Sequence, residues 1–315
     1  MKKPVWVIGL SVITFLFLLS PRSWAQYYSE EKMGGGVYGI AYGSPETFAE
    51  FHGFVNLEYF DFQKDGELGR VHGGDSSFDL HNFYFNAIAK IRQNVTAFGE
   101  IEYEHGGDEL KVDRAFIDWR IADGLAFRLG KFYTPFGLEI KTYQAPARKL
   151  VSRPLYTEEL LFDEWTDVGV NAYGILGPKP LRFIYDLAVT NGPKGLTEED
   201  TQNTDNNPRK DFIARVSVIP YLAEEIFLEI GGSYAYGKYD DDSRLTVRLF
   251  GGDLRLLAMG LELVAEYVGR NGNDATAANF CGGPPPPAHR PEHTVMVTIS
   301  KLPINSSKTF PGFTL

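Results

Sequence analysis

Apolar and polar residues alternate along most of the chain. Within residues 83–91, Phe85 falls on one face of an extended chain and Asn86 on the other. Side chains alternate in this way across a β-strand, because the pleat reverses the direction of the Cβ atom at each residue. Helical periodicity is scarce. The pattern therefore predicts strands that each have one apolar and one polar face.

The alternating segments are separated by connections of two kinds. We expect about eleven strands, at residues 48–62, 79–91, 95–105, 110–121, 125–135, 166–176, 181–190, 210–219, 225–238, 245–256 and 259–269. Short turns such as 92–94 alternate with longer polar connections such as 63–77. Short turns at one rim and long loops at the other are typical of bacterial outer-membrane barrels. The predicted fold class is all-β, an antiparallel transmembrane β-barrel with eleven or twelve recognisable strands; a secreted soluble β-protein is the alternative.

The N-terminus has the features of an export signal. Lys2 and Lys3 precede an uncharged apolar run at 5–19, and small residues stand at Ser23 and Ala25. This run of about fifteen residues is shorter than the roughly 20 that a spanning helix needs. We predict a signal peptide that is cleaved after Ala25, with an uncleaved anchor as the alternative.

The rest of the chain is interpreted as one barrel with flanking segments. Residues 26–47 are expected to be a flexible lead-in and residues 48–270 the barrel. The alternation stops after that point, although 293–302 has the pattern of one more strand. Residues 271–315 are thus an atypical tail, either the product of a truncation or frame shift near 270–280 or a genuine periplasmic tail.

Composition excludes several classes of function. A net charge of −10 and a pI near 5.2 argue against nucleic acid as a partner. The single cysteine, Cys281, rules out a disulfide framework and a cysteine-based metal site. The H-E-x-x-H, G-x-S-x-G and P-loop motifs are absent, so we expect no enzyme, cofactor or metal. The Asp240–Asp242 run is a solvated loop tip or, alternatively, a weak cation ligand.

The polar faces of the strands carry many charges. Against lipid each Arg or Lys would cost about 2–4 kcal/mol at mid-depth, so these faces are expected to line a water-filled channel. The candidate pore-lining residues are Glu100, Arg114, Asp118, Arg120, Arg128, Arg182, Asp186, Arg215, Arg248, Arg255 and Glu262. Their arginines form an anion-favouring ladder or, alternatively, pair with neighbouring carboxylates and keep the wall rigid.

One decapeptide resembles a known family. The stretch from Arg128 to Gly137, RLGKFYTPFG, is similar to the point in the phosphate-selective porin O/P family where a strand enters a long inward-folding loop. Asp167 to Val170 follows that loop, but the arginine that the family tends to place before the Gly-Val pair is missing here. The resemblance implies a trimeric general or anion-selective porin with about sixteen strands in a complete member.

The connection at 138–165 is the candidate constriction loop. Its charged residues are Lys141, Arg148, Lys149, Arg153, Glu158 and Glu159. Folded inward it narrows the pore, and folded outward it caps the surface. The expected partners are outer-membrane lipid, small hydrophilic or anionic solutes, and two further copies in a homotrimer in a Gram-negative outer membrane. A non-conducting barrel that anchors surface loops for adhesion or assembly is the alternative function.

Overall fold

The computed structural model describes residues 39–44, 47–60, 77–104, 109–140, 154, 157, 160–162, 165–178, 180–193, 205–223, 225–272 and 292–301. The predicted signal peptide lies outside them. The elements in these residues are thirteen strands: β1 (Gly39–Ser44), β2 (Thr47–Phe60), β3 (Ser77–Arg92), β4 (Val95–Glu104), β5 (Glu109–Ala122), β6 (Leu125–Tyr133), β7 (Thr166–Leu176), β8 (Leu181–Thr190), β9 (Asp211–Pro220), β10 (Ile226–Lys238), β11 (Thr246–Ala258), β12 (Leu261–Gly272) and β13 (Glu292–Lys301). In this part of the chain, no helix is long and apolar enough to cross a membrane.

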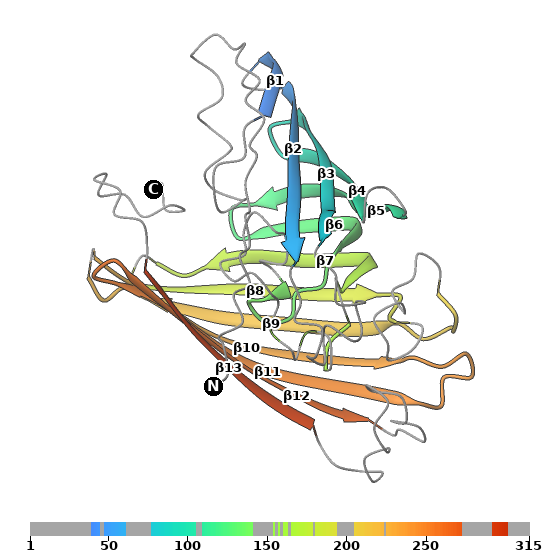
Figure 1. Cartoon of the computed structure of the whole chain (residues 1–315). Coiled ribbons are helices and arrows are strands. Elements are labelled where there is room, and N and C mark those ends of the chain that lie inside the picture. The colour runs from blue at the N-terminus through green and yellow to red at the C-terminus, as the bar shows by residue number, and fades with distance from the viewer. Residues whose placement is uncertain are drawn as a thin grey trace, which may run out of the picture.

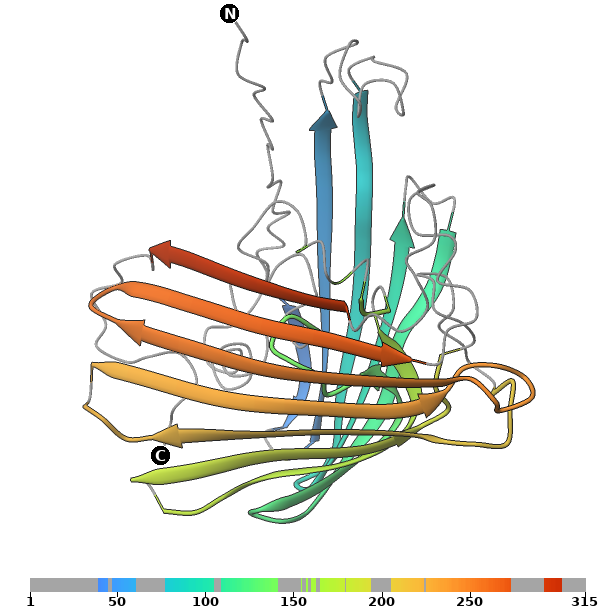
Figure 2. The ribbon, with the colours of Figure 1, turned by 90° about the horizontal axis from the view of Figure 1, so that it is seen from below.

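All thirteen strands form one antiparallel sheet. Each strand pairs with its neighbour in the sequence, so the order in the sheet is β1 to β13 without a crossover (Figure 1). Figure 2 shows that the sheet bends round, so that its two halves share one concave face. We call this concave side the inner face and the convex side the outer face.

The strand predictions agree closely with the structure. Strands β2 to β12 occupy the eleven predicted segments, and the bounds of β7 and β8 are those predicted. The short connections 93–94, 123–124 and 259–260 alternate with long ones. The confirmed fold class is therefore antiparallel β, with more strands than the eleven or twelve expected.

The two additional strands lie at the ends of the sheet. β1 falls within residues 26–47, where we expected a lead-in without a strand, and this expectation was wrong for residues 39–44. Its sequence, GIAYGS, is too short and too rich in glycine for alternation to reveal it. β13 lies where the pattern allowed one more strand, and it pairs with β12 over its whole length.

Irregular pairing is confined to the first half of the sheet. Among the described ladders, register shifts occur at Asn56/Leu57, Lys90/Arg92, Glu100/Ile101 and Arg120/Ala122. A β-bulge bends its strand and increases the local twist. The course of the strands changes across this region, from the steep β2 and β3 to the flatter β9 to β12 in Figure 1.

Candidate functional site

The two faces of the sheet carry different side chains. On β5, Ile117 and Trp119 are 45% and 47% exposed on the outer face, whereas Asp118 between them points to the inner face. On β9, Val216 is 47% exposed and the adjacent Arg215 only 2%. The sheet thus has an apolar convex surface and a charged concave surface, which is the arrangement the alternation predicts.

Two of the predicted pore-lining arginines form two-pronged ion pairs with the opposite strand. The Nε and Nη2 atoms of Arg114 donate to the Glu100 carboxylate at 2.8 and 3.0 Å. Arg128 binds Asp118 in the same way at 2.8 and 2.9 Å. The Arg128 guanidinium also lies 4.0 Å from the centre of the Phe116 ring. Parallel charge-assisted hydrogen bonds of this kind are strong and fix the geometry of both partners.

Arg215 joins three strands. From β9 it donates to Glu229 on β10 at 3.1 Å and, through Nε, to Asp253 on β11 at 3.1 Å. Further along the wall, Arg255 donates to Glu262 at 2.7 Å. These guanidinium groups are neutralised where they stand, so they hold neighbouring strands together.

The remaining predicted wall residues differ in their surroundings. Arg182 and Asp186 lie on the inner face of β8, and Asp186 accepts a hydrogen bond from Asn171 at 3.1 Å. Arg120 is exposed near the end of β5, where its carbonyl accepts a hydrogen bond from Asn94. The structure therefore groups these residues on one face without joining them into a continuous row of free charges.

Arg248 is a correction to the predicted pore lining. Its neighbours Val247 and Leu249 point to the inner face and are buried there, with 4% and 1% exposure. Arg248 lies between them, so its side chain points to the outer face, where it is exposed. There its guanidinium lies 5.9 Å from the centre of the Tyr236 ring. The alternation was interpreted with the apolar face toward lipid, but at this end of β11 the apolar side chains pack inside the sheet.

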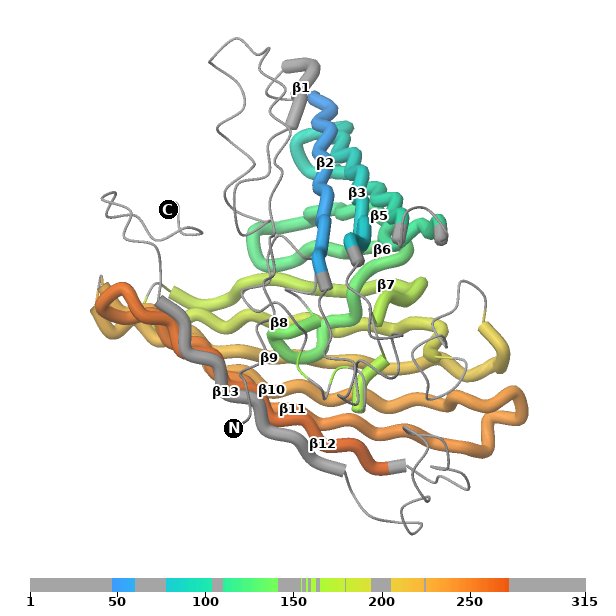
Figure 3. The backbone as a smooth tube through the Cα atoms, in the orientation of Figure 1, coloured from blue at the N-terminus to red at the C-terminus, as the bar shows by residue number. Residues whose placement is uncertain are grey.

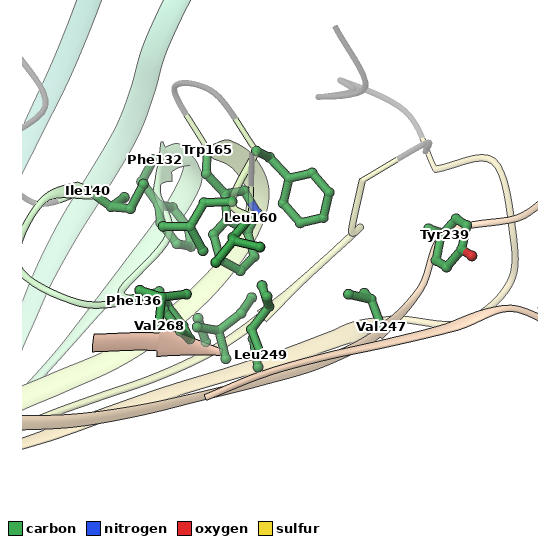
Figure 4. Close-up of a cluster of buried hydrophobic side chains, with 14 residues drawn as sticks. Phe132, Phe136, Ile140, Leu160, Trp165, Tyr239, Val247, Leu249 and Val268 are labelled. Carbon is green, nitrogen blue, oxygen red and sulfur yellow. The ribbon is translucent and has the colours of Figure 1, made fainter. Parts of the chain in front are cut away.

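Those apolar side chains pack against the two ends of the connection between β6 and β7. We call residues 134–140, 160–162 and 165 the inner segment. It lies in the concave side of the sheet (Figure 3), and its side chains pack with those of β8 to β12 (Figure 4). The buried cluster comprises Phe132, Phe136, Ile140, Leu160, Leu161, Phe162, Trp165, Ala188, Ile213, Ala235, Tyr239, Val247, Leu249 and Val268.

Polar contacts hold the beginning of the inner segment. The Gly137 N–H donates to Ser233 Oγ on β10 at 3.0 Å. The N–H groups of Leu138 and Glu139 both donate to Glu266 Oε2 on β12 at 3.1 Å. The inner segment thus lies on the inner face, and inward folding of the rest of the 138–165 connection stays a prediction. The predicted constriction residues Lys141, Arg148, Lys149, Arg153, Glu158 and Glu159 lie outside the described residues.

The inner apolar cluster was not predicted, although the sequence contains a signal for it. β9 reads DFIARVSVIP and has apolar residues on both faces, with Ile213 and Ile219 buried inside and Val216 exposed outside. A strand that is apolar on both faces is covered on both sides. Such a run within otherwise alternating strands indicates where a connection folds onto the inner face.

These features define a class of protein. A curled antiparallel sheet with an apolar convex face, a charged concave face and a connection folded onto the concave face is the wall of a porin-type β-barrel. A model of the family "Phosphate-selective porin O and P" matches residues 78–258 of the 315. The chain belongs to this family, and the resemblance inferred from RLGKFYTPFG is confirmed.

Individual relatives are distant. An uncharacterized protein of Aquifex aeolicus (strain VF5) is 27% identical over 120 residues, which are 35% of this chain and 28% of that protein. OmpT, an outer membrane protein of Vibrio cholerae, has a TM-score of 0.39 at 13% identity, over 74% of this chain and 79% of its own. An anion-selective porin from Comamonas acidovorans has a TM-score of 0.37 at 12% identity, over 72% and 80%. A trimer form of the Vibrio OmpT gives 0.33 at 14% identity, over 76% and 79%.

Proposed function

We propose that this protein is an outer-membrane porin through which small hydrophilic solutes diffuse passively. The contrast between the two faces of the sheet carries the proposal. Outward apolar side chains such as Ile117 and Val216 suit contact with lipid, whereas Arg114 and Arg128 would each cost about 2–4 kcal/mol on that side. On the concave side the same charges lie away from lipid, in the wall of the passage.

We further propose that passage favours anions, and that the wall arginines bound to carboxylates are not the main source of this preference. Arg114, Arg128, Arg215 and Arg255 are each bound to a carboxylate, and Arg248 is on the outer face. The positive field is instead assigned to the basic residues of the constriction loop, which are Lys141, Arg148, Lys149 and Arg153. Within the wall, the exposed Arg120 on β5 remains a candidate for solute contact.

The setting of the pore follows from the same proposal. The signal peptide is removed near Ala25, the mature chain inserts into the lipid of a Gram-negative outer membrane, and three copies associate. Neither a cofactor nor a catalytic residue takes part in passive diffusion. The single cysteine and the acidic net charge suit a protein of this kind.

Planar-bilayer recording tests the function. Refolded protein is expected to produce stepwise conductance, and a salt gradient should give a reversal potential that indicates anion preference. Replacement of Lys141, Arg148, Lys149 and Arg153 by glutamine should strongly reduce the preference while the steps persist. Protein that inserts into the bilayer but conducts no current would overturn the proposal.

The inner apolar cluster favours a second candidate, a non-conducting barrel that anchors surface loops. The fourteen residues of this cluster, contributed by the inner segment and by strands that include β8 to β12, lie on the side where a channel needs water. Deletion of residues 139–164 separates the two functions. A porin should conduct more when this connection is removed, whereas an anchor should lose adhesion to its partner without a change in current.

A further inference from the structure

Glu266 differs from the arginine-binding carboxylates of the inner wall in what it binds. Glu100, Asp118 and Glu262 each bind an arginine of the adjacent strand. Glu266, on β12, instead accepts hydrogen bonds from two consecutive backbone N–H groups of the inner segment. The residue is buried, with only 2% of its surface exposed. A buried carboxylate that binds the backbone of a connection fixes the position of that connection.

The contact is close and specific to one backbone conformation. Gly137 has a φ of +62°, in the left-handed region that glycine adopts without strain. A Cβ atom at this position would lie 1.8 Å from Glu266 Oε1. The absence of a side chain at Gly137 therefore allows Glu266 to reach the amides of the next two residues.

Neighbouring strands support the same contact. Ser233 on β10 accepts the Gly137 N–H, so two strands hold three successive amides of the segment. Asp253, which faces Glu266 across the β11–β12 ladder, is bound by Arg215. The Arg215 guanidinium near this site therefore binds Asp253 and Glu229, whereas Glu266 binds the backbone of the inner segment.

We propose that Glu266 is the positioning residue that holds the inner segment against β12 and thereby sets the width of the passage. The inference rests on the proposed porin function. Phe136, beside Gly137, packs against Gly251 of β11 and the Trp165 ring. Release of the Glu266 contact should therefore loosen the apolar cluster as well as the turn.

Single-channel recording tests the effect on the pore. Glu266→Ala should raise the conductance and admit larger polyethylene glycols, because the inner segment is no longer held at its beginning. Glu266→Gln should have a smaller effect, because its amide oxygen still accepts hydrogen bonds. The matched control is Glu50→Ala, which removes a buried carboxylate that binds His52 on its own strand, β2. Conductance of Glu266→Ala equal to that of the control would overturn the proposal.

Thiol labelling tests the anchor without relying on conductance. Cys281 is first replaced by serine, and Ile140, which is fully buried, by cysteine. Adding Glu266→Ala should then speed labelling at position 140 about tenfold, the factor that corresponds to about 1.4 kcal/mol. Ser233→Ala should act in the same direction. Unchanged labelling in both variants would reject the anchor, whereas changed labelling in a protein that passes no current would reject only the porin function.

Discussion

Arg114 on β5 and Glu100 on β4 lie directly opposite each other and are joined by two hydrogen bonds. The register shifts at this point, so Asp113, between the paired residues Val112 and Arg114, has no partner residue in the β4–β5 ladder. The Glu100 side chain is fully buried and that of Arg114 is 15% exposed. The guanidinium also lies 4.7 Å from the centre of the Phe98 ring and 4.5 Å from that of Tyr133. This pair is therefore part of the wall and is not available as a free anion site.

We predict that Glu100→Gln destabilises the protein, because it removes the carboxylate that binds Arg114 by two hydrogen bonds and leaves only Asp113, at 3.9 Å, near its charge. Breaking a buried pair costs about 3–5 kcal/mol, and the partial exposure of Arg114 lowers the expected loss to about 2–3 kcal/mol. Urea unfolding in lipid vesicles measures it. The double variant Glu100→Gln with Arg114→Gln should recover part of the loss. A double variant as unstable as the sum of the single variants would show that the two residues do not interact.

Arg248 provides a test of which face is the pore. Because it is exposed on the outer face of β11 beside Tyr236, Arg248→Gln should leave the reversal potential unchanged. Arg120→Gln, on the inner face of β5 where the side chain is exposed, should shift the reversal potential toward cation preference. If the Arg248 variant shifts the reversal potential as much as the Arg120 variant does, the assigned faces are wrong.

The centre of the inner cluster should contribute strongly to stability. Phe136 is fully buried and lies 5.7 Å from the Trp165 ring, so Phe136→Ala should cost about 3–5 kcal/mol. The control is Phe85→Ala on the outer face of β3, where the side chain is 41% exposed. It should cost less, and the difference is measured by the midpoint of urea unfolding. Equal losses would mean that the inner segment contributes little to the fold.

Sequence reasoning succeeded where a local pattern decides the outcome. Alternation located β2 to β12, because one face of each strand is apolar, and it placed Arg114, Arg128 and Arg215 on the inner face. It failed where a distant segment decides. Val247 and Leu249 face inward because the inner segment covers them, and nothing in β11 itself shows this.

The carboxylate that each arginine binds could not be predicted from a single sequence either. Arg215 binds Glu229 and Asp253 because the register aligns three strands, and register depends on turns and bulges as well as on the hydrophobic pattern. The anchoring of the inner segment by Glu266 joins residues more than a hundred positions apart. For the same reason, alternation could not distinguish a carboxylate that binds an arginine from one that binds a backbone.

The turn between β10 and β11 should respond to acid. Desolvation raises the pKa of the Asp240 carboxyl, but the backbone N–H groups of Arg244 and Leu245 donate to it at 3.0 and 2.7 Å. Together these hydrogen bonds outweigh the desolvation and lower the pKa of Asp240 below its ordinary value. A carboxyl with a lowered pKa stabilises the turn above the pKa of the unfolded chain, about 3.9, and this stabilisation is lost as the pH falls through the lowered pKa.

Hydrogen exchange at Arg244 and Leu245 measures this response. After correction for the intrinsic dependence of exchange on pH, protection of both amides should decrease below about pH 4. Asp240→Asn should show weaker protection at neutral pH and little further change on acidification. Protection in the unmodified protein that persists through this range would show that the carboxylate does not hold the turn.

Gly137 gives a test of the inner segment that leaves every charge in place. An added Cβ would approach Glu266 Oε1 to 1.8 Å, and a φ of +62° is unfavourable for alanine, so Gly137→Ala should displace the turn from β12. We expect a higher conductance and a loss of stability of at least about 1 kcal/mol. Gly99→Ala is the matched control, because a Cβ at that position on β4 meets no atom within 4 Å. If both variants conduct like the unmodified protein, the close contact at Gly137 does not control the passage.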